Sequence, residues 1–370
     1  MDNQLINIPK ILLMGPGPSC VSESVYKALA KPILGHLDPS FIDLMDDIKD
    51  FLKKLMGTEN QLTVPVSGTG SAGMETCFVN LIEPEDKVLI LINGVFGMRM
   101  EDVANRLGAE VDCLKFDWGN VVEVDIVRKK LLEIQYDLVA VVHAETSTGV
   151  CNPVDEIGRL VKENGALYLV DCVTSMGGIQ LQMDEWNIDA LYSGTQKCLS
   201  CPPGLSPVSF SEKALHKLTN RKSKVPNWYL DLSMITKYWS GNSRVYHHTA
   251  PINMLYGLYQ ACFNIIDEGM ENVVKRHMEM HLELIKELNK LNLQLFVQEE
   301  FRLPMLNSII IPEGVDDAKV RSSLINDYEI EIGGGLGPLA GKIWRIGLMG
   351  ETAKKESIHK LMDAFRNILN

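Results

Sequence analysis

Short apolar runs alternate with amphipathic stretches between about residues 60 and 210. The runs have the length and continuous apolar character of strands buried on both faces, and the stretches between them have helical spacing. Such alternation is typical of a mostly parallel sheet covered by helices, so the pattern predicts an α/β fold. The expected strands occupy residues 88–92, 138–142, 166–170 and 190–192.

The ends of one helix in this region are marked by particular residues. Asn152 is expected to cap its first turn and Pro153 to occupy its first helical position. Gly165 is expected to end the helix in a left-handed conformation, which glycine adopts without steric cost. This helix then lies between the second and third expected strands.

The character of the chain changes after about residue 250. Long helical stretches are expected over residues 254–267 and 270–291, followed by a strand at 308–311 and a terminal helix from Thr352. We therefore expect a boundary near residue 268 between a large domain and a smaller α+β domain. The expected division is an N-terminal arm over residues 1–20, a large domain over 21–268 and a small domain over 269–370.

A lysine and an aspartate follow two neighbouring strands of the predicted sheet. Lys197 comes after the small polar residues 193–196, and a lysine held in a partly dry site becomes a nucleophile for a carbonyl. Asp171 ends the preceding strand, and open α/β sheets bind ligands at such carboxyl ends. The two strands can thus direct an amine and a carboxylate into one crevice, although an aspartate there also suits a turn cap.

A glycine-rich segment over residues 67–75, Ser-Gly-Thr-Gly-Ser-Ala-Gly-Met-Glu, leads into an amphipathic helix. Backbone N–H groups and hydroxyls at a helix start bind anions well, which suits a phosphate. The segment matches neither the nucleoside-triphosphate loop nor the dinucleotide fingerprint. A plain turn and helix cap explains it equally well when it is taken alone.

Two more side chains have a structural and a functional interpretation. Phe96 follows a strand end between two glycines, where its ring can lie against a planar ligand or can belong to the core. Arg345 interrupts an apolar run and requires a carboxylate, which either the protein or a ligand supplies.

Two sequence features superficially suggest a metal site. Cys198 and Cys201 form a Cys-x-x-Cys pair, but no second pair completes a zinc site. His247 and His248 are adjacent, and successive residues do not face one side of a regular element. We therefore expect no metal.

Composition excludes several classes of function. The chain has 370 residues, 46% of them hydrophobic, and a formal net charge of -12. Nucleic-acid and anionic-membrane partners need clustered positive charge, so neither is expected. No apolar stretch approaches the roughly 20 residues of a membrane span. Eight scattered cysteines with no signal peptide ahead of them favour reduced thiols and a cytoplasmic location.

Taken together, these motifs resemble the class V aminotransferases of fold type I, closest to the alanine–glyoxylate and serine–pyruvate group. The likeness runs from residue 13 almost to the end of the chain, and the motifs occur in the family's order. It implies a large domain with a mostly parallel seven-stranded sheet and a smaller α+β domain. The motifs that carry it are Ser67-Gly-Thr-Gly, Val170-Asp171-Cys-Val, Ser193-Gly-Thr-Gln-Lys197, Tyr246-His-His-Thr249 and Arg345-Ile-Gly.

The resemblance implies pyridoxal 5'-phosphate as the cofactor and Lys197 as its Schiff-base partner. Asp171 would hold the protonated ring nitrogen, which keeps the ring an electron sink. Phe96, where many relatives have tryptophan, would stack on the ring beside Val173. Thr146 would bond the phenolic oxygen and contribute to substrate binding.

The resemblance also implies two anion sites, one for the cofactor phosphate and one for the substrate carboxylate. Thr69, Gly70 and Ser71 would hold the phosphate with Gln196 nearby, although relatives often have histidine in place of Ser71. Arg345 would bind the substrate α-carboxylate, and the backbone of Gly17 and Pro18 would close over it. Tyr246 and Thr249 would reach the phosphate of a neighbouring subunit, so an obligate homodimer with composite sites is expected.

The reaction implied is ping-pong transfer of an amino group from alanine or serine to glyoxylate or pyruvate. Ureidoglycine–glyoxylate and 3-hydroxykynurenine transaminases are close alternatives, and Tyr246 favours the alanine or serine type because asparagine is expected there in the ureidoglycine enzymes. A cysteine desulfurase would need a late nucleophilic cysteine, and the last cysteine is Cys262. A cofactor-binding regulatory protein on the same fold is the non-enzymic alternative, disfavoured by the presence of both Lys197 and Arg345.

Overall fold

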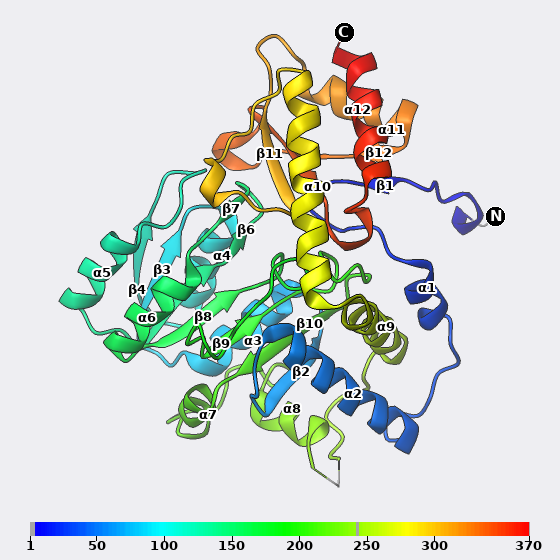
Figure 1. Cartoon of the computed structure of the whole chain (residues 1–370). Helices are drawn as coiled ribbons and strands as arrows, with labels where there is room; N and C mark the ends of the chain where they lie inside the picture. Colours follow the sequence, from blue (N-terminus) through cyan, green and yellow to red (C-terminus); the bar gives the residue numbers. More distant parts are fainter. Residues whose placement is uncertain (1–3, 242–243, 370) are drawn as a thin grey trace.

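The largest layer of the molecule is a seven-stranded sheet (Figure 1). A computed structural model of the protein describes residues 4–241 and 244–369. All neighbouring strands pair in parallel except at one strand, which is antiparallel to both neighbours. In sheet order the strands are β2 (Leu62–Ser67), the antiparallel β10 (Leu205–Phe210), β9 (Ala190–Tyr192), β8 (Leu167–Asp171), β5 (Leu138–Val142), β3 (Lys87–Ile92) and β4 (Glu110–Lys115).

The predicted α/β architecture with its mostly parallel seven-stranded sheet is confirmed. Strands β5 and β8 are buried at every residue, because helices cover the sheet and leave no solvated face. Five helices connect or flank the strands: α3 (Gly70–Leu81), α4 (Val95–Arg106), α5 (Val124–Glu133), α6 (Val154–Asn164) and α7 (Glu212–Thr219). Four more complete this part of the molecule: α1 (Glu23–Leu29), α2 (Pro39–Met56), α8 (Leu232–Trp239) and α9 (Ile252–Glu268).

The C-terminal part of the chain builds a separate layer above this sheet (Figure 1). Its three-stranded sheet has the order β11-β14-β13. Its elements are α10 (Met270–Lys290), β11 (Leu306–Ile310), α11 (Asp317–Tyr328), β12 (Ile330–Glu331), β13 (Gly333–Gly334), β14 (Ile343–Gly347) and α12 (Lys355–Leu369). Short strands and 3₁₀ turns complete the chain: β1 (Leu12–Leu13), β6 (Ala144–Glu145), β7 (Val150–Cys151), and turns at Gln4–Asn7, Glu299–Phe301, Gly337–Leu339 and Gly350–Thr352.

Two hydrophobic cores correspond to these two parts. One surrounds the seven-stranded sheet, and the other lies among α10, α11, α12 and the small sheet. Gly269, with a φ of 84°, separates α9 from α10 at the turn between them. The domain boundary near residue 268 stays a prediction that this turn supports.

The N-terminal segment is joined to the C-terminal part of the chain. Strand β1 pairs in parallel with β12, and Met14 is buried in the second core. The backbone N–H of Gly347 also donates to Met14 O at 2.7 Å. Residues that precede the large sheet in sequence are therefore held by strands that follow it.

Two expected helix starts are wrong. Helix α6 begins at Val154, with Pro153 in the cap position and no side-chain cap bond. The Asn152 amide instead donates to Val142 O at 2.8 Å and bonds Asn93, because a buried loop there needs hydrogen-bond partners. The terminal helix starts at Lys355, and Thr352 belongs to the preceding 3₁₀ turn.

The left-handed end of α6 at Gly165 is confirmed by its φ of 85°. The four expected strands are confirmed as β3, β5, β8 and β9, within one residue at each end. No helix in the described part of the chain combines the length and apolar character that a membrane crossing needs.

We predict that truncating a side chain in the central strand β8 destabilises the whole molecule. Leu169 is fully buried, so Leu169→Ala leaves a cavity and should lower the free energy of unfolding by about 2–5 kcal/mol. Denaturant unfolding followed by circular dichroism measures this loss. Leu132→Ala is the matched control because Leu132 is 81% exposed. Equal losses in the two variants would contradict the packing described here.

Candidate active site

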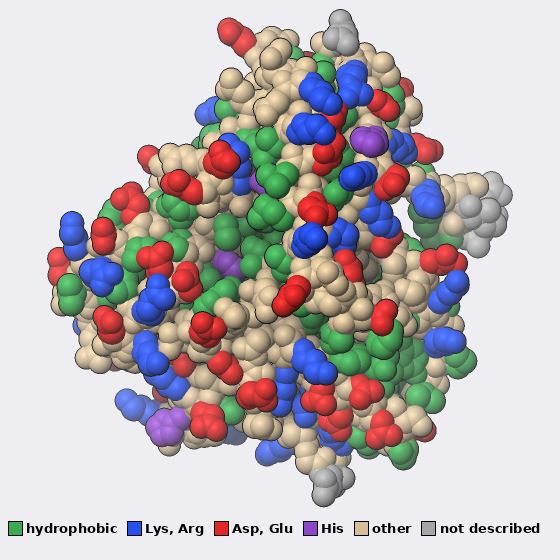
Figure 2. Space-filling view, viewed as in Figure 1, with side chains coloured by type: hydrophobic (Ala, Val, Ile, Leu, Met, Phe, Trp, Pro, Cys, Tyr) green, Lys and Arg blue, Asp and Glu red, His purple; other side chains and the backbone are tan. Residues whose placement is uncertain are grey.

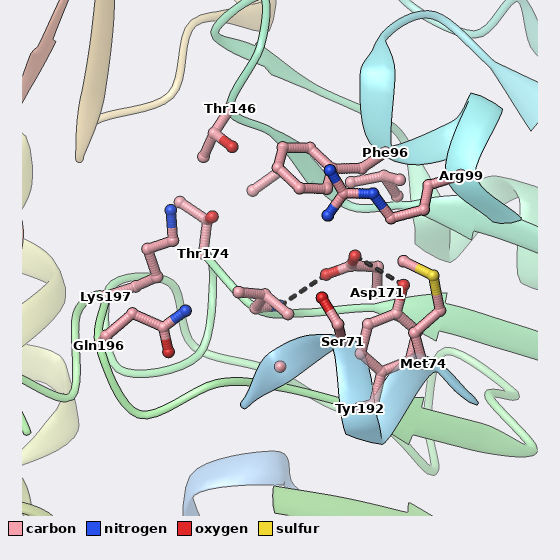
Figure 3. A pocket seen from close by; sticks show the side chains of 14 residues that line it. Ser71, Met74, Phe96, Arg99, Thr146, Asp171, Thr174, Tyr192, Gln196 and Lys197 are labelled. Atoms are coloured by element: carbon pink, nitrogen blue, oxygen red, sulfur yellow. Dashed lines mark hydrogen bonds between the residues drawn. The ribbon is translucent and has the colours of Figure 1, made fainter. Parts of the chain in front are cut away.

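One cavity gathers most of the predicted site residues at the carboxyl ends of β8 and β9 and the N-termini of α3 and α4 (Figure 3). Lys197 and Gln196 lie on the opposite side of it from Asp171 and Tyr192. Eight predicted residues line the cavity: Gly70, Ser71, Phe96, Thr146, Asp171, Val173, Gln196 and Lys197.

The Lys197 side chain is buried, and this changes the chemistry of its amine. Burial, together with the nearby positive charge of Arg345, lowers the pKa of Lys197 to about 8. The amine donates a hydrogen bond to Pro16 O from the N-terminal segment. With this pKa, roughly a tenth of the amine is uncharged at pH 7, far more than for a solvated lysine, and this neutral form is the nucleophile that a carbonyl requires.

The N-terminal segment also fixes the backbone of the Lys197 loop. Ser19 donates from its N–H to Gln196 O at 2.9 Å and from its hydroxyl to Lys197 O at 2.6 Å. Gly17 has a φ of 108°, and a Cβ there would lie 2.7 Å from Lys197 Nζ. Gly17 therefore lies against the lysine, with Pro18 next to it in the chain, and the positive φ and the close approach favour glycine at position 17.

Asp171 is a buried carboxylate held in one orientation. Its Oδ1 accepts from Val173 N at 2.8 Å, and its Oδ2 accepts from the Tyr192 hydroxyl at 2.7 Å. Burial raises the pKa of Asp171 to about 6, against the opposing effect of both hydrogen bonds. A cation on the cavity side would stabilise the ionised form, so the group suits a protonated ring nitrogen.

The glycine-rich segment forms an anion cradle at the start of α3. Thr69 is the N-cap and makes no side-chain cap bond; its carbonyl accepts from Ala72 N at 2.7 Å, and the amides before Ala72 have no partner within the helix. Gly70 packs against Val173: a Cβ added at position 70 would lie 3.3 Å from a Val173 methyl group. Gln196 Oε1 is buried without a hydrogen-bond partner among the described residues. The N–H donors at the helix N-terminus fit a phosphate group, and because a phosphate accepts hydrogen bonds, Gln196 would face it with its NH₂ group.

Arg345 lies on β14 and is held by backbone carbonyls. Its Nε donates to Gly334 O at 2.8 Å and its Nη1 to Thr146 O at 3.0 Å. No carboxylate of the described residues forms an ion pair with it, so the structure offers no internal partner of that kind. Burial lowers the pKa of Arg345 to about 10, which still leaves it charged and available to an external carboxylate.

Tyr246 and Thr249 lie outside the cavity of their own chain. Tyr246 is 55% exposed and its hydroxyl is 3.3 Å from Thr249 Oγ1. Between them, His247 and His248 are joined through their Nδ1 atoms at 2.8 Å, and His248 Nε2 is 2.8 Å from Ser67 Oγ. The predicted role of Tyr246 and Thr249 in a neighbouring subunit stays a prediction.

The cavity also contains residues that the sequence interpretation missed. Tyr192 lies opposite Asp171 in the β8–β9 register, a signal that strand alignment alone could have supplied. The Arg99 guanidinium lies 5.0 Å from the centre of the Phe96 ring, three residues earlier on α4. Glu145, adjacent to Thr146, is fully buried and accepts from Phe96 N at 3.2 Å. Among the described residues, no group of three histidine, cysteine or acidic side chains is placed to hold a metal.

Comparison with known proteins identifies the family to which this cavity belongs. The family model for class-V aminotransferases matches residues 22–344. An alanine–glyoxylate aminotransferase of Drosophila melanogaster is 39% identical over 98% of this chain and 92% of its own length. An (S)-ureidoglycine–glyoxylate transaminase of Bacillus subtilis is 36% identical over 95% of this chain and 88% of its own length.

The crystal structure of an alanine–glyoxylate aminotransferase from Nostoc sp. is 46% identical and superposes with a TM-score of 0.98. It covers 100% of this chain, and this chain covers 98% of it. Both the large sheet and the C-terminal layer are therefore shared. The chain belongs to the class-V aminotransferases, and it is a pyridoxal-phosphate-dependent enzyme of the transaminase type.

Proposed function

We propose that the protein transfers an amino group from alanine or serine to glyoxylate or pyruvate by a ping-pong mechanism. The observation that carries this proposal is the buried, partly uncharged amine of Lys197 in one cavity with Asp171. Similarity to enzymes named alanine–glyoxylate aminotransferase supports the donor and acceptor classes.

Lys197 and Asp171 have complementary tasks in this proposal. When bound, pyridoxal phosphate supplies an aldehyde for the amine and an electron-withdrawing ring. Lys197 would hold the cofactor through its neutral amine, and when free the same amine would take a proton from the α-carbon of the donor amino acid and later return one. Asp171, oriented by Tyr192 and the Val173 amide, keeps a proton on the ring nitrogen.

The cavity walls hold the cofactor from both faces and at its phosphate. Phe96 and Val173 line the cavity, so we assign them the two faces of the ring. We assign the phosphate to the start of α3, where Gly70 and Ser71 line the cavity and Thr69 caps the helix. Gln196 would donate to the phosphate from its NH₂ group at the same place.

Arg345 provides the carboxylate site of the substrate in this proposal. The two carbonyls that hold it leave Nη2 without a bond to a described residue, and one of them belongs to Thr146. The Thr146 hydroxyl would bond the phenolic oxygen of the cofactor, which places cofactor and carboxylate sites side by side. Gly17 lies against the lysine from the N-terminal side, and we assign Pro18, the next residue, to the same cover.

An exposed apolar surface supports the proposed homodimer. Apolar side chains gather over α2 and α9 on the lower right of the molecule (Figure 2). A groove there is lined by Leu34, Leu44 and Tyr259, and Phe263 beside it is 44% exposed. Such contiguous apolar surface is typical of protein–protein interfaces. A second copy of the chain bound at this surface would bring further residues, Tyr246 and Thr249 in this proposal, to the cofactor phosphate.

We also infer that the enzyme acts in the cytoplasm on small molecules. All eight cysteines are free thiols, and burial raises the pKa of Cys172, Cys198 and Cys262, which suits a reducing compartment. The net charge of -12 disfavours nucleic acid or an anionic membrane as a partner, and we infer small amino acids and 2-oxo acids from the similarity to aminotransferases.

A second candidate is transfer from ureidoglycine to glyoxylate, which the similarity to the Bacillus subtilis transaminase favours.

Adding one amino donor at a time to the holoenzyme distinguishes the candidates. We expect alanine or serine to remove the visible absorption of the lysine-bound cofactor faster than ureidoglycine or 3-hydroxykynurenine does. Lys197→Ala should show no such conversion, whereas the exposed-site control Lys129→Ala should match the wild type. If none of these donors acts, the proposed substrate group is wrong.

We predict that capture of pyridoxal phosphate by the apoprotein accelerates as pH rises toward about 8. The pKa of Lys197 is lowered, so its reactive neutral form dominates above that pH and is lost below it. Stopped-flow absorbance measures the rate. Arg345→Gln removes a positive charge that disfavours the protonated amine, so its midpoint should lie at higher pH. A rate that still rises to about 10.4, as for a solvated lysine, would contradict the prediction.

We predict that two inactive variants complement each other when co-expressed. One is Lys197→Ala, and the other combines Tyr246→Ala with Thr249→Ala. If sites are composite, a mixed dimer contains one site with an intact lysine and an intact partner contribution. Random pairing makes about half of the dimers mixed, so about a quarter of wild-type specific activity should return. Activity no greater than the sum of the separate variants would rule out composite sites.

A further inference from the structure

Helix α4 has no cap from its own sequence. Its N-cap is Gly94, which has no side chain and makes no cap bond, yet the helix begins at the cavity wall. Unpaired N–H groups at such a buried end require an acceptor from elsewhere. The acceptors come from residues 145–147, about fifty positions later in the chain.

Glu145 and Ser147 together provide these acceptors. Glu145 Oε2 accepts from Phe96 N at 3.2 Å, and Ser147 Oγ accepts from Val95 N at 3.0 Å. Glu145 Oε1 accepts from Ser147 N at 3.0 Å and from its hydroxyl at 2.5 Å, which orients the carboxylate. A Cβ on Gly94 would lie 2.3 Å from the carboxyl carbon of Glu145, so the missing side chain is what admits the carboxylate.

The carboxylate is fully buried, and every group that bonds it is a hydrogen-bond donor. A negative charge at a helix N-terminus is stabilised by the helix dipole and by these amides. The next residue, Thr146, lines the cavity and holds Arg345 through its carbonyl. One buried segment therefore supports Phe96 on one side and Arg345 on the other.

We propose that Glu145 is a positioning residue that caps α4 from outside the helix and thereby fixes the Phe96 ring against the cofactor. The inference rests on the proposed role of Phe96. Glu145 acts on the ring through the backbone N–H of Phe96, without touching the ring. Loss of its charge loosens the first turn of α4, and the ring then covers the cofactor less often.

Glu145→Gln tests this link with little change in volume. Both Ser147 donors face Oε1, so the amide oxygen stays there and its NH₂ group meets the Phe96 N–H. Two donors then oppose each other, and the bond to Phe96 is lost. We expect pyridoxal phosphate to bind the apoprotein about tenfold more weakly, as for loss of one hydrogen bond to a charged group. Absorbance titration measures the affinity, and visible circular dichroism of the bound cofactor should weaken.

A double-mutant cycle with Phe96→Ala separates this role from general destabilisation. If Glu145 acts through Phe96, Glu145→Gln should change cofactor affinity by less than about twofold in the Phe96→Ala background. Asp316→Ala is the control, because it removes the side-chain cap of α11 in the C-terminal part of the chain. It should lower the melting temperature without changing cofactor affinity.

The remaining outcomes of these affinity measurements distinguish the role of Glu145 from that of Phe96. Equal losses of affinity from Glu145→Gln in both backgrounds, or no loss in the wild-type background, would overturn the positioning role and leave that of Phe96 intact. Unchanged affinity in Phe96→Ala alone would overturn the stacking role of Phe96, and the inference with it.

Discussion

The site depends on the exclusion of water from one amine. Lys197 belongs to the loop after β9, and its side chain is buried because the N-terminal segment packs over it. Burial makes the largest contribution to its lowered pKa, and the buried charge of Arg345 adds to it. Arg345 comes from the C-terminal sheet, so three separate stretches of chain together set the protonation of a single group.

The parallel sheet supplies the other half of this arrangement. In the β8–β9 pair, Asp171 lies directly across from Tyr192, which allows the tyrosine hydroxyl to bond the carboxylate. Burial raises the pKa of Asp171 while it lowers that of Lys197, since low polarity disfavours the charged form of each. The attraction between the two opposite charges offsets part of both shifts. The same dry cavity therefore prepares an amine that releases its proton and a carboxylate that needs a cation.

The sequence predicted the parts of this site that depend on local pattern. Strand ends at Asp171 and the glycine-rich start of α3 follow from alternation of apolar and polar residues and from turn chemistry. Glu145 and Asn152 were beyond such reasoning because their partners lie some fifty residues away, and local rules describe only neighbours. The local sequence around Asn152 resembles a helix cap. In the structure Asn152 lies in the buried loop between β5 and α6, and its side-chain amide instead donates to Val142 O.

The pairing of β1 with β12 has a mechanical consequence for the site. Gly347, at the end of the strand that carries Arg345, donates to Met14 O, and a Cβ on it would lie 2.1 Å from Gly15 O. Gly333 pairs with Arg345 and lies close to the Pro16 ring. A Cβ added to Gly333 would lie 2.4 Å from Pro16 Cδ. Pro16 in turn accepts the hydrogen bond of the Lys197 amine. Because two glycines allow this close approach, the backbone that carries Arg345 and the backbone that covers the lysine form one hydrogen-bonded unit. A displacement of β14 would therefore also move the cover of the lysine, so the position of Arg345 and the burial of Lys197 are linked through the N-terminal segment.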